Sequence, residues 1–213
     1  GDIYFKDKRY TDALAKFQRA IDLSPANLKY RFKLAKIYSS KGQLKEAIET
    51  YKQAVKIDPK SGAAFYNLGL LYIGQKDIEK ARESLEMSIR VDALSFEPHK
   101  ALSRIYSQEK KYDKAIDEIS EAIKLKYDEP SLRITLGTLI LKSGKKNQAE
   151  KVFKKTAELF PKNFLVQNYI ADWYFTRRLY DKSLEFYKIA ENLDSDNPVV
   201  QARLGKIFAD KNK

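Results

Sequence analysis

Residues 28–61 read LKYRFKLAKIYSSKGQLKEAIETYKQAVKIDPKS, and residues 62–95 read GAAFYNLGLLYIGQKDIEKARESLEMSIRVDALS. The two stretches keep their small and aromatic residues in register, since Tyr38 and Ala47 recur thirty-four residues later as Tyr72 and Ala81. A fixed period of this length is typical of stacked helical units, none of which can bury its apolar face alone. The sequence therefore predicts a solenoid and not a globule.

The period runs through the whole chain without an insertion or a deletion. Three columns, which are sets of residues spaced thirty-four apart, show this period. Two consist of small residues and one of mostly aromatic residues. The columns are Ala13, Ala47, Ala81, Ala115, Ala149 and Ser183; Ala20, Ala54, Ser88, Ala122, Thr156 and Ala190; and Tyr4, Tyr38, Tyr72, Tyr106, Ile140, Tyr174 and Phe208.

Each unit contains two apolar blocks at helical spacing, separated by a polar break such as Ser40–Gln43. This pattern predicts a first helix, a tight turn and a second helix. The second helix is expected to end near a proline, because Pro25, Pro59 and Pro161 fall on the period and proline interrupts a helix.

Unit 28–61 carries the full signature as Leu34, Ala35, Tyr38, Ala47, Tyr51, Ala54 and Pro59. This pattern resembles the tetratricopeptide repeat in both its period and its small, aromatic and proline positions. The resemblance covers the entire chain. It implies an all-α fold, a right-handed superhelix of helix-turn-helix units with about thirteen helices. The chain departs from the family pattern at the closing proline, which is replaced by Ala93, Tyr127 and Ser195, and at a bulky first-helix position, which holds Arg31, His99, Arg133 and Gln167.

Counting along this frame predicts a single array over residues 1–213. Its divisions are a partial unit at 1–27, full units at 28–61, 62–95, 96–129, 130–163 and 164–197, and a helix at 198–213 that either caps the array or begins a severed unit. Gly1 falls halfway through a first helix and no initiator Met precedes it, so we expect a fragment of a longer protein.

The composition argues against catalysis. The chain has no cysteine and a single histidine, His99, which leaves no thiol nucleophile, disulfide or His-His metal pair, and no phosphate-binding loop or dinucleotide-binding turn occurs. We expect no enzyme activity, no catalytic residue, no metal and no cofactor. No apolar stretch is long enough to span a bilayer, so we expect no membrane insertion of this segment. Cytoplasmic and periplasmic or other extracytoplasmic locations are both compatible with the sequence.

The resemblance implies that a partner binds in a concave groove lined by variable positions of the first helices. The candidate groove residues are Phe5, Phe32, Lys36, Tyr66, Asn67, Leu70, Ile73, Lys100, Arg104, Ile134, Leu141 and Phe175. Five of them, Leu70, Ile73, Ile134, Leu141 and Phe175, are apolar where an empty groove would face water, which predicts side-chain pockets.

A basic column formed by Lys36, Lys100 and Arg104 predicts an acidic feature on the ligand. Some family members bind a peptide's terminal carboxylate through lysines, asparagines and an arginine on three first helices. Asn67 matches one of those positions, but Phe32 and Lys36 precede it, so that set is not assembled. The alternative for both features is ordinary: tight curvature buries groove side chains, and cations align by chance.

The leading hypothesis is a non-catalytic scaffold or adaptor that binds a partner peptide or helix and helps to assemble a multiprotein complex. A nucleic-acid-binding array is the first alternative, motivated by the net charge of +12, although 29 acidic residues are interleaved with 41 basic ones. Self-association is the second, because the ends of a repeat array expose apolar faces, and a dimer through those ends would form easily in a crystal.

Overall fold

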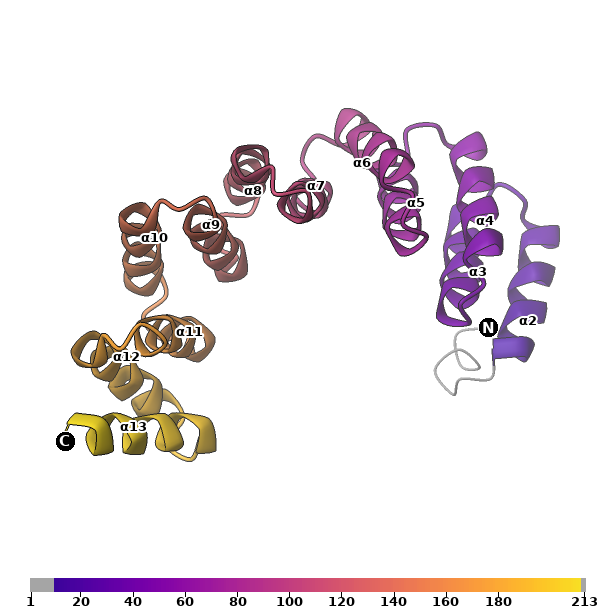
Figure 1. Ribbon diagram of the computed structural model, residues 1–213. Coiled ribbons are helices and arrows are strands. Elements are labelled where there is room, and N and C mark those ends of the chain that lie inside the picture. Colours follow the sequence, from indigo (N-terminus) through magenta and orange to yellow (C-terminus); the bar gives the residue numbers. More distant parts are fainter. Residues whose placement is uncertain (1–9, 212–213) are drawn as a thin grey trace. The chain divides into compact units, whose positions relative to one another are not determined.

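The computed structural model describes residues 10–211, and within that range the chain forms helices and no strands (Figure 1). The predicted all-α fold is confirmed, with twelve helices in the described residues against about thirteen expected. Their bounds are α2 Tyr10–Leu23, α3 Leu28–Ser40, α4 Leu44–Ile57, α5 Gly62–Gly74, α6 Ile78–Val91, α7 Glu97–Gln108, α8 Tyr112–Leu125, α9 Pro130–Lys142, α10 Lys146–Leu159, α11 Phe164–Phe175, α12 Tyr180–Leu193 and α13 Pro198–Lys211.

The helices group into two compact units. Unit 1 comprises Gly1–Lys110 and contains α2 to α7, and unit 2 comprises Lys111–Lys213 and contains α8 to α13. Within unit 1, α3 lies beside α4 and α5 beside α6, and within unit 2, α9 lies beside α10 and α11 beside α12. The division into thirty-four-residue repeats stays a prediction.

The turn between the first and second helix of a pair needs one residue in the left-handed region. That residue recurs on the period: Gly42 has φ 74° and Gly144 has φ 88°, while Lys76, Lys110 and Arg178 have φ 63°, 60° and 57°. Glycine adopts this conformation freely, whereas a residue with a Cβ is strained in it. The tight turns therefore occur where the polar breaks predict them, and three of them carry strain.

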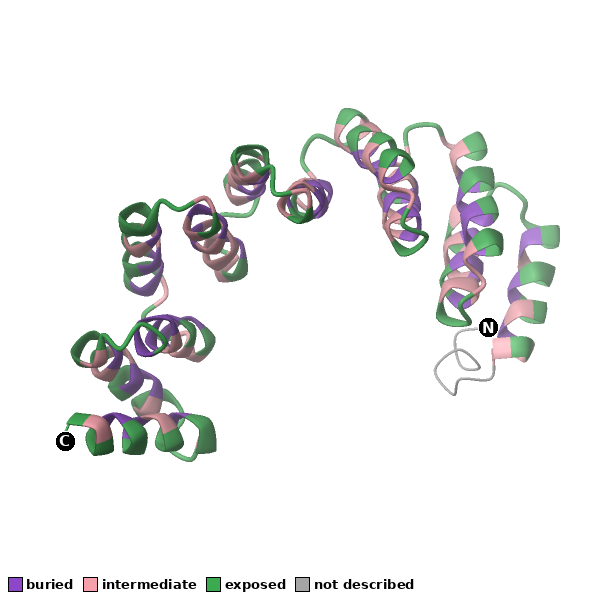
Figure 2. Cartoon of the chain, viewed as in Figure 1, coloured by how far each residue is buried: buried purple, intermediate pink, exposed green. Residues whose placement is uncertain are grey.

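Small residues set the distance between paired helices. Ala47 and Ala81 are fully buried, and a Cβ added to Gly69 of α5 would lie 2.7 Å from Cγ of Leu85 on α6. In unit 2, a Cβ added to Gly137 would lie 2.4 Å from Cε1 of Phe153. Large side chains of the second helices thus sit directly on the backbone of the first helices, which gives each unit a dense core. Figure 2 marks the buried residues along the helices of both units.

The polar residues at the bulky first-helix position tie the preceding loop to the helix. Arg31 donates to the backbone oxygen of Pro25, and Arg133 donates to that of Tyr127 at 3.4 Å. Gln167 is 1% exposed and donates through Nε2 to the oxygen of Pro161 at 3.3 Å. In each case the acceptor lies six residues earlier. Hydrogen bonds to loop carbonyls therefore replace the apolar anchor that the family often has.

Candidate functional site

Three first helices of unit 1, α3, α5 and α7, carry most of the candidate residues. α5 contacts α7 directly, so the side chains of these two first helices form one surface, and α4 contacts both α3 and α5. We call this set the first-helix surface of unit 1: Phe32, Lys36, Tyr66, Asn67, Leu70, Ile73, Lys100 and Arg104. The remaining candidates belong to unit 2, except Phe5, which lies outside the described residues.

The apolar residues of this surface are half-buried. Leu70 and Ile73 pack against the core cluster that contains Leu68, Leu71 and Leu85, and Tyr66 packs there too. Their expected exposure to water is therefore met only in part. Each side chain still presents some apolar surface.

Phe32 is also half-buried. Its ring meets that of Tyr51 on α4 edge-on, with centroids 5.2 Å apart and planes at 82°, a favourable aromatic geometry. The α4 helix thus fixes the ring at one edge of the surface, so Phe32 offers a rigid apolar contact.

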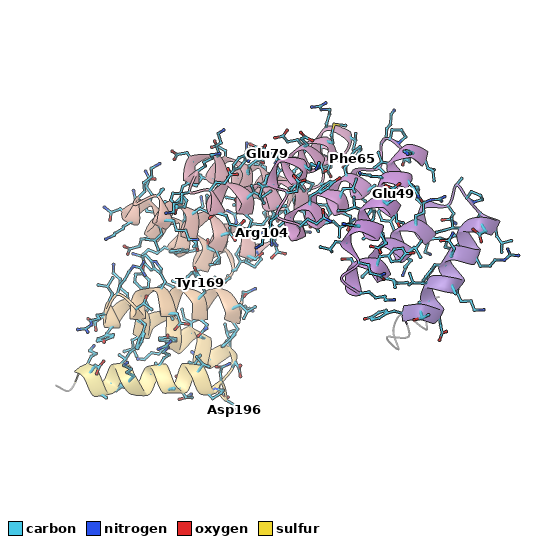
Figure 3. The ribbon with its side chains drawn as sticks, turned by 45° about the vertical axis from the view of Figure 1, so that its right-hand side comes forward. Glu49, Phe65, Glu79, Arg104, Tyr169 and Asp196 are labelled. Atoms are coloured by element: carbon cyan, nitrogen blue, oxygen red, sulfur yellow. The ribbon has the colours of Figure 1, made fainter. Side chains whose placement is uncertain are left out.

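The cations of this surface are exposed. No described residue forms a hydrogen bond or ion pair with the side chain of Lys100 or Arg104, whereas Arg82 of the same unit is held by Glu109 at 2.8 Å. Figure 3 labels Arg104, whose side chain is exposed on α7. The α7 helix therefore presents two positive charges to solvent.

Tyr66 adjoins both the apolar and the basic residues of the first-helix surface, since it packs on the core cluster and interacts electrostatically with Arg104. Burial, and then the nearby Glu97 carboxylate, raise the pKa of its hydroxyl, while Arg104 lowers it. A tyrosine hydroxyl is neutral at physiological pH even at its ordinary pKa near 10, so that of Tyr66 is available for hydrogen bonding. Asn67 differs, because its Nδ2 already donates to the backbone oxygen of Ala63 in its own helix at 2.7 Å.

In unit 2 the candidate residues contribute less open surface. Ile134 and Leu141 of α9 are half-buried and pack against the cluster around Phe153 and Trp173. Phe175 of α11 is only 8% exposed, so the expectation that it faces water is wrong.

The cause is α13, whose residues share a core cluster with Phe175. The guanidinium of Arg203 lies 4.6 Å from the centre of the Phe175 ring, and Nε of Arg203 pairs with the Asp172 carboxylate at 3.1 Å. Asp172 also accepts a hydrogen bond from the hydroxyl of Tyr187 at 2.6 Å. The charges of Arg203 and Asp172 beside Phe175 are therefore engaged with one another.

Two features of unit 2 were missed by the sequence reasoning. Tyr169 is 37% exposed, and its hydroxyl lies 2.8 Å from Oγ1 of Thr138 on the neighbouring first helix. It occupies the sixth position of its thirty-four-residue repeat, which Asn67 holds in 62–95, but the sequence reasoning did not extend that position to 164–197. A pocket of about 460 Å³ also lies at the end of α11, lined by Phe175, Thr176, Arg178, Tyr180, Lys206 and Asp210. It depends on α13, whose placement the repeat pattern does not specify.

Other kinds of site receive no support from the described residues. Between residues 10 and 211, no group of histidine, aspartate and glutamate side chains is arranged to hold a metal ion. Nor does any helix in this range have the length and apolar character needed to cross a bilayer.

Comparison with known proteins identifies the repeat. A TPR repeat model matches residues 1–42 and 35–76, and two tetratricopeptide repeat models match residues 62–93 with 101–129 and residues 134–198. No curated protein sequence is similar enough to count as a relative.

Solved structures share the fold. The MamA protein is 25% identical with a TM-score of 0.66, over 76% of this chain and 88% of that one. Pseudomonas aeruginosa PilF is 22% identical with a TM-score of 0.66, over 87% and 86% of the two chains. YrrB, described as a TPR protein with an unusual peptide-binding site, is 19% identical with a TM-score of 0.60, over 87% and 96%.

Proposed function

From the premise that this chain belongs to the tetratricopeptide repeat family, we propose that it is a non-catalytic interaction scaffold. It holds a segment of a partner protein on the first-helix surface of unit 1 and thereby helps to assemble a multiprotein complex.

The observation that carries the proposal is the pairing of exposed charge with half-exposed apolar surface. Lys100 and Arg104 are exposed and unengaged by any described acidic residue, next to Tyr66 and Leu70 on the adjoining helix. Some cations elsewhere in the described chain are paired, as Lys182 is with Glu150 at 2.8 Å. An unpaired basic face beside apolar contacts suits a ligand with an acidic group and one or two apolar anchors.

The family supports this class of function. YrrB carries its peptide-binding site on the same fold, although an identity of 19% shows likeness of fold alone. The basic face formed by Lys100 and Arg104 makes the proposal specific to this chain, because it favours a partner segment with an acidic group.

The test is capture with the whole chain as bait from nuclease-treated extract of its native source, followed by lysine cross-linking. The proposal expects a protein that cross-links to Lys100 of α7 and not to Lys56 of α4, an exposed lysine on a second helix. Capture that occurs from untreated extract but not from nuclease-treated extract would instead support a nucleic-acid partner. In that case affinity should fall on the order of a thousandfold between about 50 and 200 mM salt.

A further inference from the structure

A pocket of about 430 Å³ lies in unit 2 where residues of α10, α11 and α12 come together, and we call it the α10–α12 pocket. None of its lining residues belongs to α13. Its volume is within the range of sites that hold a small molecule or a side chain of a partner protein. It lies outside the first-helix surface of unit 1, so it is a second candidate for binding.

The wall of the α10–α12 pocket includes an aromatic pair and an exposed aliphatic residue. The rings of Tyr174 and Phe186 are stacked, with centroids 5.6 Å apart and planes at 15°. Phe186 is half-buried, and Ile189, about one turn further along α12, is 37% exposed. Apolar surface therefore remains in contact with water here, and a ligand that covers it gains binding energy.

Two carboxylates at the pocket lack a cationic partner. Glu158 of α10 and Glu185 of α12 are exposed, and no described residue forms an ion pair with either. The two lysines that line the pocket, Lys154 and Lys182, are instead both held by Glu150, at 3.6 and 2.8 Å. The lysine charges are thus engaged, whereas Glu158 and Glu185 leave negative charge for a ligand.

A buried hydrogen-bond acceptor also belongs to the wall. Gln167 lines the pocket and is 1% exposed. Its Nε2 donates to loop carbonyl groups, but its Oε1 has no hydrogen-bond partner among the described residues. A buried oxygen without a donor is unfavourable, so a ligand that brings an N–H group to this oxygen is favoured.

Unit 1 contains an incomplete counterpart three thirty-four-residue periods earlier. It is a smaller pocket of about 200 Å³, and three of its lining residues, Tyr72, Lys80 and Glu83, correspond to Tyr174, Lys182 and Glu185. At the positions of Glu158 and Gln167, however, unit 1 has Lys56 and Phe65. The second carboxylate and the buried acceptor are therefore not consequences of the repeat pattern itself.

We propose that the α10–α12 pocket binds the side chain of an arginine in a partner protein. The guanidinium group is planar, permanently cationic and carries five N–H donors, so it matches free carboxylates, an aromatic ring and an unpaired acceptor together. A lysine ammonium lacks this planar fork. The first-helix surface of unit 1 favours an acidic segment instead, so the inference goes beyond the proposed function.

The probe is N-acetyl-arginine amide, titrated against the whole isotope-labelled chain and followed by heteronuclear NMR. We expect saturable shifts centred on Ile189 and on the side-chain amide of Gln167, with a dissociation constant on the order of 1 mM. N-acetyl-citrulline amide has a similar shape without the charge, and it should bind at least about tenfold more weakly.

The carboxylates are tested with a double variant of the protein. Glu158→Gln with Glu185→Gln should weaken binding of the arginine probe at least about tenfold without lowering the Tm, because both residues are exposed. The matched control is Glu83→Gln with Glu86→Gln, which removes the same charge from exposed positions on α6. It should change the affinity less than about twofold.

Three results would overturn the proposal. The absence of a saturable shift in the wild type would mean that the pocket does not hold a guanidinium group. Equal affinities for the arginine and citrulline probes, or equal losses in the two double variants, would mean that Glu158 and Glu185 do not recognise the charge. Tighter binding of N-acetyl-leucine amide than of the arginine probe would identify an apolar occupant. None of these outcomes involves Lys100 or Arg104, so the proposed function is tested separately.

Discussion

The side-chain nitrogen Nε2 of Gln167 donates a hydrogen bond to the backbone oxygen of Pro161 at 3.3 Å. The same nitrogen lies 3.2 Å from the oxygen of Phe160 and 3.3 Å from that of Ala157. Gln201, thirty-four residues later, repeats this arrangement and donates to the backbone oxygen of Ser195 at 3.0 Å. A polar residue at this position thus satisfies carbonyl groups where one unit passes into the next.

Gln167→Leu should lower the stability of the chain by about 1–3 kcal/mol, because buried carbonyl groups lose their donor. The control is Gln201→Leu, whose side chain is exposed, so that water replaces the lost bond and the effect is smaller. Thermal unfolding followed by circular dichroism measures both. A neutral or stabilising Gln167→Leu would show that its unpartnered Oε1 costs more than its Nε2 contributes.

Lys76→Gly should raise the stability by about 1 kcal/mol, because Lys76 has φ 63° in a turn where Gly42 and Gly144 are the equivalents. The control is Lys52→Gly, an exposed position in the middle of α4, where glycine should cost about 0.5–1 kcal/mol. The midpoint of urea unfolding reports each change. If both variants are destabilised alike, the left-handed residue is not strained.

Gly137→Ala should destabilise the chain by about 1–3 kcal/mol, since the new Cβ would lie 2.4 Å from the ring of Phe153 and forces it to move. Gly74→Ala is the matched control, because its nearest neighbour would be Leu44 at 3.8 Å, an ordinary contact. We expect that variant to be neutral or more stable by up to about 1 kcal/mol. Differential scanning calorimetry of the two proteins decides the comparison.

Alkaline pH should destabilise the chain partly through Tyr51. Burial raises the pKa of its hydroxyl to about 12, whereas in the unfolded chain it titrates near 10. The raised pKa favours the neutral folded form, so the stabilisation is complete below pH 10 and is lost as the pH rises toward 12, by about 1.4 kcal/mol per pH unit.

Tyr51→Phe removes this contribution, so its denaturation midpoint should fall less steeply than that of the wild type between about pH 10 and 12. Tyr127→Phe, at a position that is 72% exposed, should follow the wild-type curve. Identical pH profiles for all three proteins would contradict the shift.

The sequence alone predicted the helical architecture, because the same repeated positions mark both the helices and the residues that pack between them. Each column has one physical task, as with Ala81, which is small so that two helices can approach, and is fully buried. The orientation of Phe175 could not be predicted, because it depends on Arg203 and on how α13 packs. The contact of Tyr169 with Thr138 and the hydrogen bonds of Gln167 likewise join neighbouring thirty-four-residue repeats within unit 2. The period of the sequence does not specify such contacts.

The half-burial of Leu70 and Ile73 also changes how the proposed site is tested. A charge placed at either residue would disturb the core on which they pack, so lost binding could follow from lost folding. The exposed cations Lys100 and Arg104 avoid this problem, because neither side chain forms an ion pair with an acidic residue among the described positions.

The most direct measurement is the affinity of the captured partner segment, by fluorescence anisotropy, for the wild type and two double variants. Lys100→Ala with Arg104→Ala removes the charges of α7, and Lys56→Ala with Arg90→Ala removes the same charge from exposed positions on α4 and α6. We predict that the first pair weakens binding at least about tenfold, whereas the second changes it less than about twofold. Equal losses in both pairs, or none in the first, would contradict a binding site on the first-helix surface of unit 1.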